Sequence, residues 1–175
     1  MATESSLRHA IGVDFGGTFI KMALVSEKGD IIASETIPTS EASTRDAWMD
    51  AVETGLEKLS ADAPFDRSEI SGIGVGVPGF VDYERGYLYE LANVPGWNGV
   101  PLASLMEERF AMRVRVDNDV NAMALGECTF GAGRVYSHAV FVTLGTGVGG
   151  GILINNQLYR GAYSMAGEVG HMTIE

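Results

Sequence analysis

One supersecondary pattern occurs twice in this chain, and it limits the possible folds more than any other feature. In residues 10–32 a short apolar strand runs into the turn Gly16-Gly17-Thr18 and is followed by a strand, a turn and another strand. Residues 139–161 repeat that order around the turn Gly145-Thr146-Gly147. A repeated strand–glycine turn–strand unit predicts an internal duplication.

Between the two copies, strands alternate with amphipathic helices, which predicts an α/β fold. The pattern predicts helices over 43–59, 101–110 and 119–128 and strands over 70–77 and 114–116. The first helix has a capping signal in Ser43 and Asp46. We expect one complete domain over residues 1–135 and the opening strands of a second, incomplete domain over 136–175, as in a truncated sequence.

The strand predicted over 70–77 has glycine at alternate positions, namely Gly72, Gly74 and Gly76. One face of this strand therefore carries no side chains. Such a face must let another backbone or a ligand come very close.

The two glycine turns are candidate phosphate sites. Without Cβ atoms, the backbone N–H groups of such a turn can approach an anion. Asp14 ends the strand before the first turn, where a carboxylate can hold Mg²⁺ through water. A hairpin turn without a ligand is the alternative for either turn alone, but the pair favours a polyphosphate held between the two units.

Gly145, Gly147 and Gly150 match the spacing of the dinucleotide-binding fingerprint. That fingerprint requires a helix after the glycines, and here the following residues predict a strand, so a Rossmann site is not expected.

Two acids flank Asn118 where a short strand gives way to a helix. Asp117, Asn118 or Asp119 could each cap the helix or interact with its dipole. One capping residue is sufficient, so a further carboxylate suggests chemistry. Kinases use an aspartate in this way to accept the proton of the attacking hydroxyl group.

Two turn-rich segments and one short motif suit a polyhydroxylated ligand. Residues 74–82 and 91–102 offer polar groups such as Asn93 and a ring, Trp97, for stacking, although for either segment alone ordinary Pro-Gly turns are the favoured explanation. Glu168 and His171 would share one face of a helix, or else be solvated polar residues.

Composition excludes several classes of partner. The formal net charge is -11 and the 12 Lys and Arg residues are scattered, so nucleic acid is not expected. No apolar stretch approaches the roughly 18 to 20 residues of a membrane span. The polar N-terminus lacks the apolar region of a secretory signal, and Cys128 is the single cysteine. These features favour a cytoplasmic protein.

The segments DFGGTFIK, GVPGFVD, NVPGWNGVPL, DNDVNA, LGTGVGGG and EVGH, in this order, resemble the ROK family (repressor, open reading frame, kinase), above all its glucokinase-type sugar kinases. The resemblance covers nearly the whole chain. It implies the sugar kinase/Hsp70/actin ATPase fold, in which two ribonuclease-H-like domains surround a cleft.

The resemblance also implies roles for individual residues. Asp119 matches the catalytic base, and Asp14 matches the acid near Mg²⁺ and the phosphates. The sugar-binding residues are expected to be Gly79, Asn93, Asn118, Glu168 and His171. The ATP-binding residues are expected to be Asp14, Gly16, Gly17, Thr18, Lys21, Gly145, Thr146 and Gly147. In most members the histidine matching His171 also binds a structural Zn²⁺ with three downstream cysteines, which this chain does not contain.

We therefore expect an ATP-dependent hexokinase that phosphorylates glucose at the 6-hydroxyl, acts as a homodimer and is inactive as this fragment. An N-acetylhexosamine kinase and a non-catalytic sugar sensor are the alternatives, and an actin-like or Hsp70-like ATPase fits the motifs less well. A DNA-binding helix-turn-helix, as in the repressor branch, is not expected because the first strand begins by His9.

Overall fold

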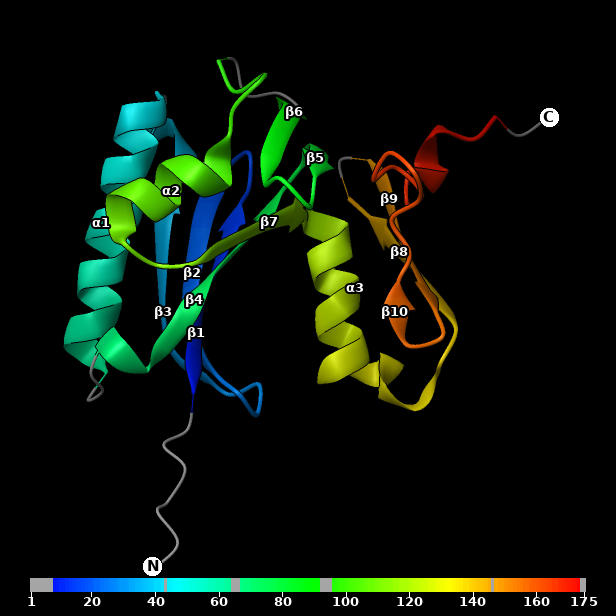
Figure 1. Cartoon of the computed structure of the whole chain (residues 1–175), viewed down its shortest axis with the longest axis horizontal. Coiled ribbons are helices and arrows are strands. Elements are labelled where there is room, and N and C mark those ends of the chain that lie inside the picture. The colour runs from blue at the N-terminus through cyan, green and yellow to red at the C-terminus, as the bar shows by residue number, and fades with distance from the viewer. Residues whose placement is uncertain (1–7, 43, 64–66, 92–95, 146, 174–175) are drawn as a thin grey trace, which may run out of the picture.

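The computed structural model describes residues 8–42, 44–63, 67–91, 96–145 and 147–173. Three sheets and three α-helices make up this part of the chain (Figure 1). The strands are β1 (His9–Phe15), β2 (Phe19–Ser26), β3 (Ile31–Pro38), β4 (Ile70–Val77), β5 (Gly79–Asp82), β6 (Tyr87–Leu91), β7 (Val114–Asn118), β8 (Ala139–Leu144), β9 (Val148–Ile154) and β10 (Gln157–Leu158). The helices are α1 (Arg45–Asp62), α2 (Leu102–Phe110) and α3 (Asp119–Thr129).

A mixed five-stranded sheet, in the order β3-β2-β1-β4-β7, forms the centre of the first unit, the part of the chain that contains β1 to β7. β1, β2 and β3 are antiparallel neighbours, whereas β4 and β7 run parallel to β1. Parallel neighbours need crossover connections, which α1 and α2 supply. The predicted α/β fold is therefore confirmed. The β8–β9–β10 sheet repeats the opening antiparallel meander.

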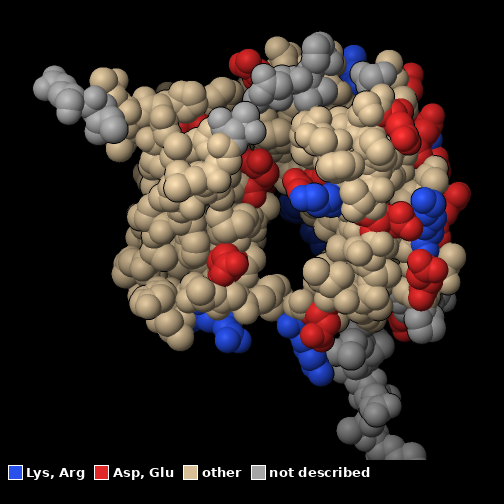
Figure 2. Space-filling view, turned by 180° about the vertical axis from the view of Figure 1, so that it is seen from behind, with Lys and Arg blue, Asp and Glu red and all other residues tan. Residues whose placement is uncertain are grey.

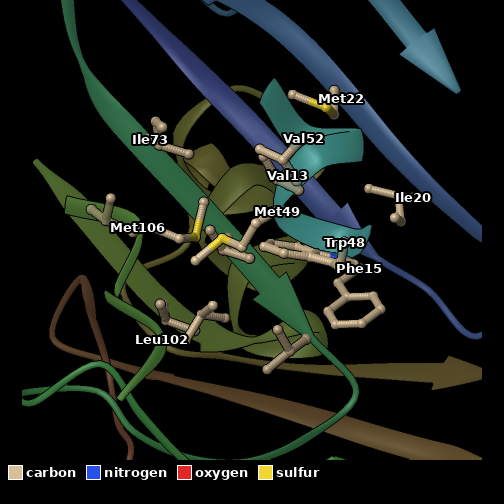
Figure 3. Packing of buried hydrophobic residues seen from close by; sticks show 14 of the residues in the cluster. Val13, Phe15, Ile20, Met22, Trp48, Met49, Val52, Ile73, Leu102 and Met106 are labelled. Carbon is tan, nitrogen blue, oxygen red and sulfur yellow. The ribbon is translucent and has the colours of Figure 1, made fainter. Parts of the chain in front are cut away.

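One face of the five-stranded sheet is buried beneath α1 and α2 (Figures 1 and 3). Val13, Val75 and Val116 occupy one register line across β1, β4 and β7, and all three are buried. Because strand side chains alternate between faces, the next residues along these strands point to the opposite face.

Three aromatic rings form the densest part of this core. Phe15 lies 4.9 Å from both Trp48 and Trp97, measured between ring centroids, and the two tryptophans are 5.3 Å apart. Trp97 is only 1% exposed. The ring packs edge-on against the other two, which favours an ordinary turn over stacking on a ligand, the two alternatives for this segment.

Helix α1 begins later than predicted. Its N-cap is Thr44, whose side chain accepts a hydrogen bond from the Ala47 N–H at 3.2 Å. The predicted cap, Ser43, lies outside the described residues. Asp46 lies in the first turn of the helix and is exposed.

Helix α3 lies between the five-stranded sheet and the β8–β10 sheet (Figure 1). Glycines allow this close packing on both sides. A Cβ at Gly76 of β4 would lie 3.4 Å from Asp119 Cα, and one at Gly151 of β9 would lie 2.6 Å from Ala124 Cβ. A helix thus approaches the bare face of β4 at Gly76, although a Cβ there would make only ordinary contacts, whereas one at Gly151 would clash.

The β5–β6 hairpin is not predicted by the sequence pattern, which indicated only turns for these residues. Gly79 pairs with Leu91 across the hairpin, and a Cβ at Gly79 would lie 2.1 Å from the Glu90 carbonyl oxygen. This position therefore requires glycine for backbone packing alone. Within the described part of the chain, no helix combines the length and apolar character that crossing a membrane requires.

Candidate functional site

The candidate site lies on the sheet face opposite the core, at the carboxyl ends of β1, β4 and β7. Asp14, Gly76 and Asp117 occupy one register line there, one residue beyond the buried valines. Gly76 contributes no side chain between the two acids, and α3 begins directly above it. Chain segments distant in sequence thus bring carboxylates to one edge of the sheet.

Asp119 is the first residue of α3 and is partly buried. Its carboxylate accepts a hydrogen bond from the Val120 N–H at 2.9 Å. Burial raises the pKa of Asp119, the nearby carboxylates of Asp14 and Glu168 raise it further, and the Val120 hydrogen bond lowers it. A carboxylate with a raised pKa is a stronger base than an ordinary aspartate, as proton abstraction requires.

Because its pKa is raised, ionised Asp119 should reduce the stability of the fold. Folding favours the protonated form, so the native chain loses stability as pH rises through the raised pKa. Asp119→Asn keeps an acceptor for the Val120 N–H without the charge, so we expect its melting temperature at pH 7 to be about 2 °C higher. The gain should disappear below the ordinary aspartate pKa of 3.8.

Circular-dichroism melting at pH 7 and at pH 3 would measure this effect. Asp46→Asn is the matched control, because Asp46 also lies in the first turn of a helix but is exposed. Its loss should lower the melting temperature slightly by removing a favourable interaction with the helix dipole. A gain for Asp119→Asn that is equal at both pH values would contradict the prediction.

Asn118 is the N-cap of α3. Its Oδ1 accepts hydrogen bonds from the Val120 and Asn121 N–H groups, and its Nδ2 donates to the Gly79 carbonyl at 3.4 Å. The cap fixes the orientation of the first turn that carries Asp119. Sugar binding by Asn118 and Gly79 stays a prediction, with the structural roles of both residues now evident.

Hydrogen bonds from a residue outside the β1–β2 turn stabilise that turn. Gly16 N–H donates to the Phe19 carbonyl at 3.0 Å, and the buried Thr39 donates through Oγ1 to the Gly16 carbonyl at 2.7 Å. Thr39 N–H also donates to the Thr18 carbonyl at 2.9 Å. Sequence reasoning missed Thr39, which follows the third strand and gives no local signal of this contact.

Three glycines of the two turns face open space. A Cβ at Gly17, Gly145 or Gly147 would meet no atom of the described structure within 4 Å. The fold itself therefore does not require glycine at these positions. A ligand that comes close to the backbone, as predicted for phosphate, would explain why these positions carry glycine.

Asp14 and Lys21 face each other across β1 and β2, with Lys21 Nζ 3.7 Å from Asp14 Oδ2. More than half of each side chain is exposed, at 52% for Asp14 and 64% for Lys21. An ion pair this exposed stabilises the fold little, so both groups are available to a ligand.

Glu168 and His171 lie at the two ends of a short 3₁₀ turn, η4 (Val169–His171), with Glu168 as its N-cap. His171 Nε2 is 3.8 Å from Glu168 Oε2, so the two side chains share a face. The preceding residue, Gly167, packs on β9, where its Cβ would lie 2.2 Å from the Gly150 carbonyl oxygen.

The glycines of β9 allow close packing on both faces of this strand. Gly149 and Gly151 face Val120 and Ala124 of α3, whereas Gly150 faces Gly167 and Val169. A strand without side chains at these positions separates the helix that starts at Asp119 from the segment that carries Glu168. Seen from behind, a deep hollow separates the two parts of the molecule, with acidic side chains on both walls (Figure 2).

Sequence reasoning missed three side chains that complete the site. Arg160 donates through Nε and Nη2 to Asp117 Oδ2, at 3.0 and 2.6 Å, and its guanidinium lies 3.6 Å from the centroid of the Tyr83 ring. Asn121 donates from Nδ2 to Asp117 Oδ1 at 3.1 Å. Asp117 is thus an interaction centre rather than only the end of a strand, and no local pattern indicated its partners.

Comparison with known proteins identifies the family. The model of the ROK family matches residues 10–175. The chain belongs to the ROK family. It is 40% identical over 167 residues to the glucokinase of Halalkalibacterium halodurans, covering 95% of this chain and 50% of that protein. It is 39% identical over 165 residues to a putative xylose repressor of Caldicellulosiruptor sp., covering 94% of this chain and 41% of that protein.

A solved ROK structure matches just as widely. The ROK family glucokinase from Streptomyces griseus, in complex with glucose and AMPPNP, superposes with a TM-score of 0.83 at 36% identity, covering 95% of this chain and 51% of that one. The predicted fold class is therefore confirmed. This ROK chain spans about half the length of the relatives it matches.

The predicted metals differ in how well this ROK chain fits them. Among the described residues, no three His, Cys, Asp or Glu side chains form a group that could hold a metal ion. Zn²⁺ at His171 therefore does not fit, since such a site needs about four protein ligands. Mg²⁺ at Asp14 stays a prediction, with which the exposed Asp14 carboxylate is compatible, because Mg²⁺ keeps several waters and uses one or two carboxylates beside substrate phosphates. The predicted ligands Asn93 and Thr146 lie outside the described residues.

Proposed function

We propose that the protein carrying these residues transfers the γ-phosphoryl group of ATP to the 6-hydroxyl of a hexose, with glucose as the first candidate. The observation that carries this proposal is the position of Asp119. Burial raises its pKa, and two nearby carboxylates raise it further: Asp14, which precedes the β1–β2 glycine turn, and Glu168, which follows the Gly167 that packs on β9. A base between the predicted phosphate side and the predicted sugar side is the arrangement that phosphoryl transfer requires.

In the proposed reaction, Asp119 accepts the proton of the sugar hydroxyl as that oxygen attacks the γ-phosphorus and the bond to the β-phosphate oxygen breaks. Capping by Asn118 holds Asp119 at the start of α3. The open glycine turns at Gly17 and Gly147 leave room for phosphate oxygens to accept hydrogen bonds from backbone N–H groups.

The surplus of carboxylates supports a cation as part of this mechanism. The charges of Asp14 and Glu168 both act on Asp119, and a polyphosphate beside them would add negative charge. When bound, Mg²⁺ neutralises phosphate oxygens and the charge that develops on them. Asp14 would hold it through water, and Lys21 would supply a further positive charge on the same sheet face.

An assay of ADP release coupled to calorimetry tests this function on the native protein. We expect ATP-dependent ADP release that requires one sugar from a panel of glucose, mannose and N-acetylhexosamines, and heat of binding with the same sugar. The absence of sugar-dependent ADP release over the whole panel would contradict the kinase assignment. The homodimer and the cytoplasmic location remain predictions, which native mass spectrometry and fractionation would check.

A non-catalytic sugar sensor is the second candidate, and the likeness to a putative xylose repressor favours it. A sensor needs the sugar-binding residues without turnover at Asp119. Sugar binding with no ADP release, at any nucleotide concentration, would support the sensor over the kinase.

A further inference from the structure

A partly buried ion pair connects the two sheets close in sequence to the candidate base. Arg160 follows β10, and Asp117 lies on β7, so 43 residues separate the partners along the chain. Their side chains are only 20% and 12% exposed. Both donated hydrogen bonds reach the same carboxylate oxygen, Oδ2.

Two further contacts hold this pair in one geometry. The Tyr83 ring, from the β5–β6 turn, stacks beneath the guanidinium, and the Asn121 amide occupies the other oxygen of Asp117. Both oxygens of Asp117 therefore have partners, and its Oδ1 also accepts from the Asn118 N–H at 2.9 Å. A guanidinium fixed by a carboxylate and a ring is far more restricted than a surface arginine.

Each residue of the ion pair directly precedes a segment that contains predicted binding residues. Asp117 is followed at once by Asn118 and Asp119. Arg160 opens the loop that ends at Glu168, and the Arg160 carbonyl accepts a hydrogen bond from the Ala166 N–H at 3.0 Å, which closes that loop.

Little else holds this loop in place. No residue described between positions 159 and 173 is buried. Hydrophobic burial, which orders most of the chain, therefore contributes little here. The contacts that the structure describes here are the backbone hydrogen bonds, the packing of Gly167 and Val169 on Gly150 and of Gly170 on Val148, and the ion pair.

We propose that Arg160 is a positioning residue, which through Asp117 orders the segment 160–171 and holds Glu168 and His171 in place relative to Asp119. An ion pair that loses most of its water adds little net stability, so the expected effect of this pair is to specify geometry. The catalytic part of the proposal rests on the proposed sugar kinase function, whereas the ordering of the segment does not.

Hydrogen exchange of the native protein tests the ordering directly. Arg160→Met keeps an unbranched aliphatic stem but removes the guanidinium group and its charge. We expect it to accelerate exchange at the Ala166, Glu168 and Val169 amides at least tenfold, with the amides of β1 and β4 unchanged. Arg115→Met is the matched control, since Arg115 is an exposed arginine on the same strand as Asp117, and it should change neither group.

Kinetics then test the coupling to the site. Arg160→Met should raise the sugar dissociation constant about tenfold and lower kcat as well, and Arg160→Lys should restore part of both losses. If Arg160 acts through Asp117, the variant carrying both Asp117→Asn and Arg160→Met should be no worse than the poorer single variant.

Three results would overturn the proposal: unchanged exchange over 166–171 in Arg160→Met, equally accelerated exchange throughout the chain, or losses that add up in the double variant. A native protein that transfers no phosphate would overturn the proposed function instead. In that case the exchange pattern still decides whether the pair orders the segment.

Discussion

Asp119→Asn should lower kcat for sugar phosphorylation by about 10³-fold, within the range that a general base contributes. Asparagine has nearly the same shape and keeps the acceptor for the Val120 N–H, but it does not take up a proton. The dissociation constant of the sugar should stay within about threefold of the native value, since the lost interaction acts on the reacting proton.

Steady-state kinetics with the ADP-release assay, and calorimetry with sugar, would separate these two effects. Asp46→Asn, in the first turn of α1, again serves as the control and should leave kcat unchanged. Comparable turnover in the native protein and Asp119→Asn would refute the assignment of the base. Combined with the melting experiment, the expected result is a variant that is more stable and nearly inactive, as a strained catalytic group implies.

Gly167→Ala should lower the unfolding free energy by about 1–3 kcal/mol, the usual cost of forcing extra volume into a packed site. Its methyl group would lie 2.2 Å from the Gly150 carbonyl oxygen and 3.1 Å from the Gly150 carbonyl carbon. Both atoms belong to the backbone of β9, so the strand or the loop must shift. Because Glu168 is the next residue, we also expect sugar affinity to fall about tenfold.

Gly147→Ala is the matched control for this experiment. A methyl group there meets no described atom within 4 Å, so the melting temperature should stay the same or rise slightly. If phosphates occupy that space, ATP should bind more weakly while sugar binding is unchanged. Denaturant unfolding and calorimetry with each ligand would measure the contrast. A Gly167→Ala protein as stable as Gly147→Ala would show that the 167–170 segment does not pack as described.

The helices and strands of the first unit were predictable because their side chains follow the periods of regular structure. The alternating residues of β1 and the stripe of α1 are local signals that need no partner to interpret. The β5–β6 hairpin escaped prediction because the Pro78-Gly79 pair at its start indicates a turn equally well. The place of Trp97 stayed open for a related reason, since a ring in a turn-rich segment can face either a ligand or the core.

The candidate site divides in the same way. Asp119 at the start of a helix and Asn118 as its cap follow from residue type and position alone. The sequence could not indicate which atoms would surround them. Coulomb repulsion from Asp14 and Glu168 acts between residues more than 45 positions apart, and only folding brings them close.

The sequence by itself determined the duplicated glycine-turn unit, the α/β order and the acid at the start of α3, because each depends on neighbours along the chain. Only the tertiary structure decided that Asp117 binds Arg160, that the glycines of β9 admit α3 on one face and Gly167 on the other, and that Trp97 lies in the core. Those contacts join residues far apart in sequence. Their distances depend on how sheets and helices pack, and the secondary-structure preferences of neighbouring residues do not determine that packing.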